Sequence, residues 1–418
     1  MSPGRLIRRP RPAATWRRLA AVLGPNLSVA GQSLVALALN SSTSLLAGAF
    51  LGAITGTFER LPGLLILVPP AIGLRGNVFS ALGSRLSTAI HTGQFRPSLR
   101  RGTALGDNVI ASLLLTAGLS LALALVAKVV AVAFGVRHTI SVLDLATISV
   151  LGGMLASAIV LIATVLLALG AARFGWDLDN LVAPIVSTLG DVLTLPALWA
   201  AAHLVGRGRF SVGLGWLVAV LAAAAVVYGW RARRELLRSV VRQSWPILVL
   251  ALLLSTLAGV VIERRLETLS AFPALLILVP AFVSSAGALG GILSSRLSSR
   301  LHLGTLQATA MPTPAARWDA GLLAFLAIPL YVFNGLGAHV VAGWLGKASP
   351  GIGSMLGASL LGATGAVLFV VVVAYYSSVG AFRFRLDPDT YGIPAITSSV
   401  DCVGAIALVS AIVALGIA

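Results

Sequence analysis

The sequence predicts an all-α polytopic membrane protein with two parallel five-helix repeats, joined by one extra transmembrane helix. Three observations predict it: an apolar composition, recurring long apolar runs, and two sequence blocks that occur twice. The 418 residues are 58% hydrophobic and 10% charged, with a mean hydropathy of +0.98. Because soluble globular proteins carry about 25% charged residues, this composition excludes a soluble enzyme, a nucleic-acid-binding module and a disordered scaffold.

The basic charge is explained by membrane topology. The net charge is +17, but the arginines cluster beside apolar segments, where positive charge marks the cytoplasmic side of a membrane protein. We therefore expect a lipid bilayer around the chain and no nucleic-acid partner. One cysteine, Cys402, allows neither an internal disulfide nor a cysteine-based metal cluster.

Two blocks indicate an internal duplication. Residues 64–69 and 275–280 both read LLILVP, and this offset of 211 gives 14 identities over the 30 positions 64–93. At an offset of 210, WDLDNLVAPIVSTLGD (176–191) matches LDPDTYGIPAITSSVD (386–401). The shared frame is D-x-D-x4-P-x2-[ST]-[ST]-x2-D.

The spans follow from apolar runs of about 20 residues or more, the length that crosses a bilayer. They are 33–56, 61–89, 105–132, 141–169 and 179–204 in the first half, 212–230 between the halves, and 245–262, 271–299, 320–345, 352–376 and 389–417 in the second. Since five is odd, the extra span makes the halves parallel, with a pseudo-two-fold axis along the membrane normal. We expect a basic cytoplasmic arm or interfacial helix at 1–32, repeats at 33–210 and 243–418, and the linking helix with a basic cytoplasmic loop at 211–242.

The arginines also predict the orientation. With a cytoplasmic N-terminus, the inner loops hold eighteen arginines and the outer loops seven basic residues, in agreement with the positive-inside rule. No secretory signal peptide is expected, because the basic N-terminal stretch lacks a cleavage site of small residues. The sequence thus predicts a multi-pass plasma-membrane protein with its N-terminus in the cytoplasm and its C-terminus outside.

The duplicated frame carries the candidate metal site. It holds six of the thirteen acidic residues: Asp177, Asp179, Asp191, Asp387, Asp389 and Asp401. Asp191 and Asp401 come twelve residues after the expected helix starts, about 18 Å deep at 1.5 Å per residue, and Ser187, Thr188, Thr397 and Ser398 share their helix faces. An ionised carboxylate at this depth is costly unless water, a cation or a partner meets it. A cation site is favoured, and a protonated aspartate bonded to a neighbouring helix is the alternative.

The remaining polar residues have simpler expected roles. The four outer aspartates of the frame are expected to cap helix starts, or to form an acidic vestibule as well. Pro69, Pro70 and the stretch 73–77 are expected to break the second span, which would then line the pathway. We expect Arg85 and Arg296 to contact lipid phosphates or the outer aspartates, and Glu263 to be a solvated residue of an outer loop.

LVPPAIGLRGNVFSALGSRLSTAIHTG (67–93) and DLDNLVAPIVSTLGDVLTL (177–195) resemble characteristic blocks of the MgtE-type divalent cation transporters, in particular the duplicated branch that includes solute carrier family forty-one. The resemblance implies a Mg²⁺ pathway on a two-fold axis, with Asp191 and Asp401 at its centre and Asn77 nearby. MgtE forms this axis from two chains, whereas this chain would form it as a monomer from its two halves. Asn77 is Ala288 in the second copy, so we expect asymmetry. The N-terminal arm is too short for the cytosolic modules of MgtE, so their gating is not expected.

The predicted function is transport of a divalent cation, with Mg²⁺ as transported ion and no cofactor. Mg²⁺ is usually held by one or two carboxylates and retained water, and Mn²⁺ or Co²⁺ fits the same oxygen ligands. The main alternative is an aspartate-rich membrane enzyme that binds a Mg²⁺-diphosphate, like prenyltransferases, and a structural membrane protein is a third. The sequence leaves open whether the protein is a channel or a coupled exchanger.

Overall fold

The computed structural model describes residues 12–136, 139–175, 178–384 and 393–417, and within them the chain forms thirteen α-helices and no β-strand. Eleven of these helices are long and apolar enough to cross a membrane, as predicted. The helices are α1 (Pro12–Ala53), α2 (Thr55–Arg60), α3 (Leu64–His91), α4 (Ala104–Ala133), α5 (Val142–Phe174), α6 (Leu178–Ala202), α7 (Arg209–Arg231), α8 (Glu235–Glu263), α9 (Leu266–Ala271), α10 (Pro273–His302), α11 (Pro314–Trp344), α12 (Ile352–Phe384) and α13 (Ile393–Ala414).

The order of long and short helices in α1–α6 returns in α8–α13, and α7 lies between the two sets. Even the short helices correspond, because α2 begins at Thr55 and α9 begins 211 positions later, at Leu266. Helix starts follow local rules: the hydroxyls of Thr103, Ser141 and Thr313 accept backbone N–H groups at the starts of α4, α5 and α11. The repeat of the sequence is therefore also a repeat of the fold.

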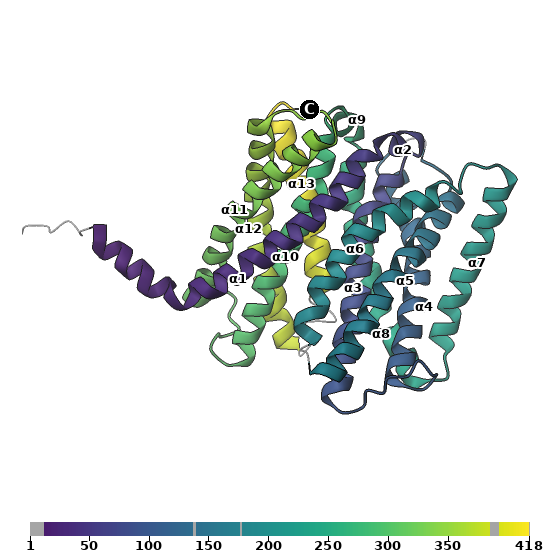
Figure 1. Ribbon diagram of the computed structural model, residues 1–418, viewed down its shortest axis with the longest axis horizontal. Coiled ribbons are helices and arrows are strands. Elements are labelled where there is room, and N and C mark those ends of the chain that lie inside the picture. Colours follow the sequence, from purple (N-terminus) through teal and green to yellow (C-terminus); the bar gives the residue numbers. More distant parts are fainter. Residues whose placement is uncertain (1–11, 137–138, 176–177, 385–392, 418) are drawn as a thin grey trace, which may run out of the picture.

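The first spanning helix of each half packs against the second spanning helix of the other half. In Figure 1, α1 crosses the bundle obliquely towards α10, and α8 packs against α3 in the same way. Gly48 of α1 and Gly259 of α8 allow these crossings, because a Cβ at either position would overlap the carbonyl oxygen of Ile277 or Ile66. Small residues let membrane helices approach this closely. The two halves are thus interlocked rather than merely adjacent.

The position of each helix follows from its burial. In the most apolar windows of α3 and α10, 61% and 72% of the residues are buried, against 22% for α7. Helix α7 packs on α4, α5 and α8 and lies at the edge of the bundle in Figure 1. Helices α3 and α10 therefore form the centre, and α7 is a peripheral connection.

One structural expectation was wrong: Pro69 and Pro70 do not break the second span. Helix α3 runs without interruption from Leu64 to His91, with both prolines inside it. Proline removes a backbone donor, but a transmembrane helix tolerates this loss where neighbouring helices surround it. Helix α3 has such neighbours, since α4, α6 and α8 pack on it.

Candidate functional site

Asp191 is buried where the two halves meet. It lies in the middle of α6 and is 5% exposed. Ser44 of α1 donates a hydrogen bond to its Oδ2 atom at 2.7 Å, and Ser284 of α10 donates to the same oxygen at 3.3 Å. The carboxylate is therefore held by the first spanning helix of its own half, α1, and by the second spanning helix of the other half, α10.

Asp401 of α13 has the equivalent surroundings. Ser255 of α8 donates to its Oδ2 atom at 2.8 Å, and Ser255 follows Ser44 by the repeat offset of 211. Gly73 of α3 is the repeat equivalent of Ser284, and a Cβ at Gly73 would lie 3.7 Å from Asp401 Oδ2. The pseudo-two-fold arrangement thus includes both carboxylates, but the hydroxyl that Ser284 offers to Asp191 has no counterpart at Gly73.

The polar groups behind the two aspartates also differ. Next to Asp191, the Asn40 amide donates to Ser284 at 3.1 Å. Next to Asp401, a narrow gap that is too small for a water molecule lies beside Ser255; its lining residues are Pro70, Gly73, Leu74, Asn77, Leu248, Ala251, Leu252, Ser255 and Ser398. The position of Asn40 corresponds to Ala251 in the second half. The two halves therefore differ around the aspartates at more positions than the expected pair Asn77 and Ala288.

Open space remains beside each of the two central helices, α3 and α10. A Cβ at Gly76 of α3 or at Gly287 of α10 would meet no atom within 4 Å, and these glycines are equivalent at the repeat offset. Among the described residues, no three His, Cys, Asp or Glu side chains lie together. An ion at this interface would therefore depend on two carboxylates, hydroxyls and water.

The other predicted site residues are only partly brought together. Ser398 is buried and lines the narrow gap beside Ser255 together with Asn77. Thr397 donates to the Pro394 carbonyl at 3.3 Å, while Ser187 and Thr188 are half-buried one turn before Asp191. Asp177, Asp387 and Asp389 lie outside the described residues, as does the side chain of Asp179. Their roles as caps or as a vestibule stay predictions.

The hydroxyl groups that bind the aspartates were not predicted from the sequence; they belong to Ser44, Ser255 and Ser284. A signal for two of them was present, because Ser44 and Ser255 begin a shared S-x-L-A-G pattern at the repeat offset. Ser284 had no such signal, since its counterpart is Gly73. Its contact with Asp191 follows from the crossing of the two halves.

Glu263 was assigned wrongly to a solvated outer loop. It is 8% exposed at the end of α8, and its Oε1 atom accepts the backbone N–H of Gly63 at 2.7 Å. Gly63 precedes α3, where free N–H groups and the helix dipole favour a negative charge. The repeat equivalent of Glu263 is Gly52 in the first half, and the N–H of Ala274, which is equivalent to Gly63, donates to the Ala348 carbonyl at 3.3 Å instead.

Arg85 and Arg296 form contacts with the next helix, whereas the expected contacts with lipid phosphates or the outer aspartates stay predictions, because those aspartates lie outside the described residues. Arg85 donates to the Asn108 side chain at 2.9 Å, and Arg296 pairs with Asp319 at 3.0 Å. Asn108 and Asp319 are equivalent at the repeat offset. Each half thus joins its second and third spans through an arginine.

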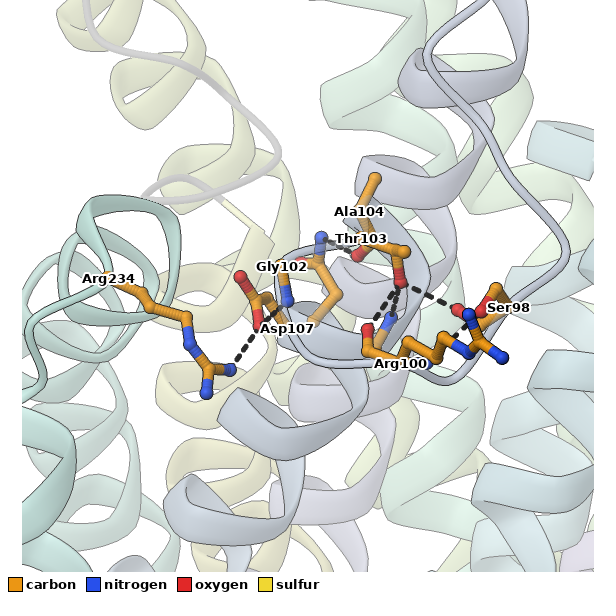
Figure 2. A network of polar contacts seen from close by, with 9 residues as sticks. Ser98, Arg100, Gly102, Thr103, Ala104, Asp107 and Arg234 are labelled. Carbon is orange, nitrogen blue, oxygen red and sulfur yellow. Dashed lines mark hydrogen bonds and ion pairs between the residues drawn. The ribbon is translucent and has the colours of Figure 1, made fainter.

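A neighbouring network joins the first half to the connection between α7 and α8. Figure 2 shows Asp107 between the backbone N–H of Gly102, at 3.0 Å, and the guanidinium of Arg234, at 2.6 Å. In the same view Thr103 donates to the carbonyls of Ser98 and Arg100. The loop before α4 is thereby held in one shape and tied to the linker.

Eleven apolar helices in two interlocked halves, with paired buried acids at the interface, define a duplicated helical membrane transport protein. A family model described as MgtE, divalent cation transporter, matches residues 68–201 and 279–411. Because these two segments make up more than half of the chain and are separated by the repeat offset, the chain belongs to the MgtE family of divalent cation transporters. This membership assigns it to the transporters and leaves the alternative of an aspartate-rich enzyme without support.

Curated relatives agree with this assignment. The chain is 26% identical over 369 residues to solute carrier family 41 member 3 of Rattus norvegicus. This match covers 83% of this chain and 78% of the relative. For the Mus musculus member 3 the identity is 26%, with 83% and 74% covered. For Homo sapiens member 2 it is 25%, with 83% and 63% covered. No solved structure matches the chain at a significant level.

Proposed function

We propose that this protein transports Mg²⁺ across the plasma membrane, through a pathway between its two halves that is centred on Asp191 and Asp401. The observation that carries the proposal is the equivalent placement of these two acids at the interface, each bonded to a serine from the first helix of its own half. Buried carboxylates at membrane depth mark ion pathways. Their duplication matches a pathway shared by two halves of one chain.

The ligand chemistry favours a hydrated dication. Two carboxylates balance the charge of Mg²⁺, which gives up its water reluctantly and is often held through one or two carboxylates. The described serine hydrogen bonds reach the Oδ2 atoms of Asp191 and Asp401, so that each Oδ1 can accept from a water of the ion. Mn²⁺ and Co²⁺ would fit the same oxygen set, because such sites discriminate by geometry and availability.

The topology completes the proposal. The excess of arginine in alternate loops supports an N-terminus in the cytoplasm and a C-terminus outside. Since both halves of the pathway come from one chain, the functional unit is a monomer. The full set of the two serines and two aspartates is then present once per molecule.

Ion flux into liposomes tests this function. The purified protein is reconstituted into liposomes that enclose a Mg²⁺-sensitive dye. Uptake of Mg²⁺, Mn²⁺, Co²⁺ and Ca²⁺ is then compared with and without sodium and pH gradients. We expect Mg²⁺ uptake that falls at least about tenfold in Asp191→Ala and in Asp401→Ala, because each change removes half of the negative charge facing the ion.

The matched control is Asp144→Ala, which removes an acid bonded to Ser141 in the first turn of α5, away from the interface. It should transport like the wild type. If both interface variants fold and retain wild-type Mg²⁺ uptake, the assignment of the pathway to Asp191 and Asp401 is wrong. If the protein takes up Mn²⁺ but not Mg²⁺, the assignment of Mg²⁺ as the transported ion is wrong, while the assignment of the pathway stands.

A further inference from the structure

A second charged position lies inside the membrane bundle, away from the two aspartates. Arg75 of α3 is 1% exposed, and its Nη1 atom donates to the carbonyl of Ala71, one turn earlier. Its Nε atom has no hydrogen-bond partner in the part of the chain that the structure describes. The ion pairs among those residues all involve other arginines. A buried guanidinium without a counter-charge is costly, so a partner for Arg75 is physically required.

Buried hydroxyl groups line the same region. Ser112, Thr116 and Ser120 follow one another at intervals of four residues on α4, and Ser157 lies on α5; each is at most 1% exposed. Within the described residues, none of these four hydroxyls has a hydrogen-bond partner. Buried Thr164 behaves in the ordinary way, because it donates to the carbonyl of Val160 four residues earlier. The four unpartnered hydroxyls are thus available to a ligand.

The guanidinium and the hydroxyls converge at Gly153 of α5. A Cβ at Gly153 would lie 2.6 Å from Ser120 Oγ and 2.7 Å from Arg75 Nη2, so both groups point to the space that the glycine leaves. Thr116 lies one turn from Ser120, and Ser157 lies one turn from Gly153. Because α4 and α5 are antiparallel neighbours, Thr116 and Ser157 occupy the next level along the same groove between helices.

The second half lacks every one of these groups. At the repeat offset, Arg75 corresponds to Ala286, Ser112 to Leu323, Thr116 to Ala327 and Ser120 to Tyr331. Tyr331 packs its ring against Phe282, with centroids 4.8 Å apart. The equivalent space is therefore filled by apolar contacts. The polar cluster is a property of the first half only and is not part of the shared pathway.

We propose that the first half binds a small monovalent anion of the halide class between α3, α4 and α5, with Arg75 as its charge partner and Ser120 and Thr116 as hydroxyl donors. The guanidinium only donates hydrogen bonds, and each serine or threonine hydroxyl can donate one, so the cluster suits an acceptor with a single negative charge. A cation would be repelled by Arg75, and a doubly charged anion would exceed the charge of one guanidinium. The bound halide neutralises Arg75 on α3, the helix that also places Gly73 beside Asp401.

Thermal unfolding of the purified full-length protein tests the proposal without any transport measurement. The midpoint is followed by the fluorescence of the eight tryptophans, in chloride, bromide or gluconate as sodium salts at constant ionic strength. We expect chloride and bromide to raise the midpoint in a saturable manner, as a ligand of the folded state does. Arg75→Gln and Ser120→Ala should each raise the half-saturating chloride concentration at least about tenfold.

Thr164→Ala is the matched control, since it removes a buried hydroxyl of α5 that is already bonded within its own helix. It should keep the wild-type chloride response. An equal midpoint in gluconate and chloride would overturn the proposal, and so would an unchanged response in Ser120→Ala. Should Arg75→Gln fail to fold, Ser120→Ala decides, because it leaves the charge in place. The outcome is independent of Mg²⁺ flux, so it leaves the proposed transport function untouched.

Discussion

The crossing of α1 over α10 predicts the effect of a single methyl group. In Gly48→Ala, the new Cβ would lie 2.9 Å from the carbonyl carbon of Ile277 and overlap its oxygen. Favourable carbon contacts lie at about 3.5–4.0 Å, so α1 has to move away by at least about 0.5 Å. Ser44 lies one turn earlier on α1, and this movement stretches its 2.7 Å hydrogen bond to Asp191.

The expected cost follows from these two changes. Overpacking contributes about 1–3 kcal/mol, and a weakened hydrogen bond to a charged group contributes up to about 1.5–3 kcal/mol. The gain in helix propensity from glycine to alanine returns about 1 kcal/mol. We therefore expect Gly48→Ala to lower the free energy of unfolding by about 1.5–5 kcal/mol and to reduce Mg²⁺ flux.

The measurement combines thermal unfolding in detergent with flux into liposomes. Gly321→Ala is the control, because a Cβ at this position of α11 meets nothing within 4 Å; it should match the wild type or be slightly more stable. Gly259→Ala should repeat the loss in the other half, where the Cβ would lie 2.9 Å from the Ile66 carbonyl carbon. Stability and flux of Gly48→Ala equal to those of Gly321→Ala would refute the reasoning.

Two further predictions concern the interior. Gly287→Val fills the open space beside α10, so we expect a wild-type unfolding midpoint but at least about fivefold less Mg²⁺ flux; wild-type flux would show that this space is not part of the pathway. Asp319→Asn removes the carboxylate paired with Arg296 and Arg300, whose side chains are 23% and 36% exposed. Breaking a buried pair costs about 3–5 kcal/mol, and partial hydration of these arginines reduces this to about 1–3 kcal/mol. Asn108→Asp, which supplies the missing carboxylate in the first half, should not lower the unfolding midpoint, and a loss as large as that of Asp319→Asn would contradict this account.

The number of spans and the duplication could be predicted because their signals are local. Long apolar stretches and the blocks beginning at Leu64 and Leu275 are present in the linear sequence. Backbone hydrogen bonds of a membrane helix are satisfied within the segment itself, so composition alone determines whether a segment spans. The same locality drew attention to Asp191 and Asp401, since charged residues inside such segments are rare.

The partners of those acids were decided only by the tertiary structure. Ser44 meets Asp191 across 147 positions, and Ser284 meets it from the other half of the chain. Glu263 reaches Gly63 across 200 positions, although its place in the sequence suggested a solvated loop. These contacts depend on how closely helices approach and at which register, which is determined by small residues such as Gly48 and by all neighbouring helices together. Local patterns therefore specify the helices of this protein, whereas the meeting of its polar side chains is a property of the packed bundle.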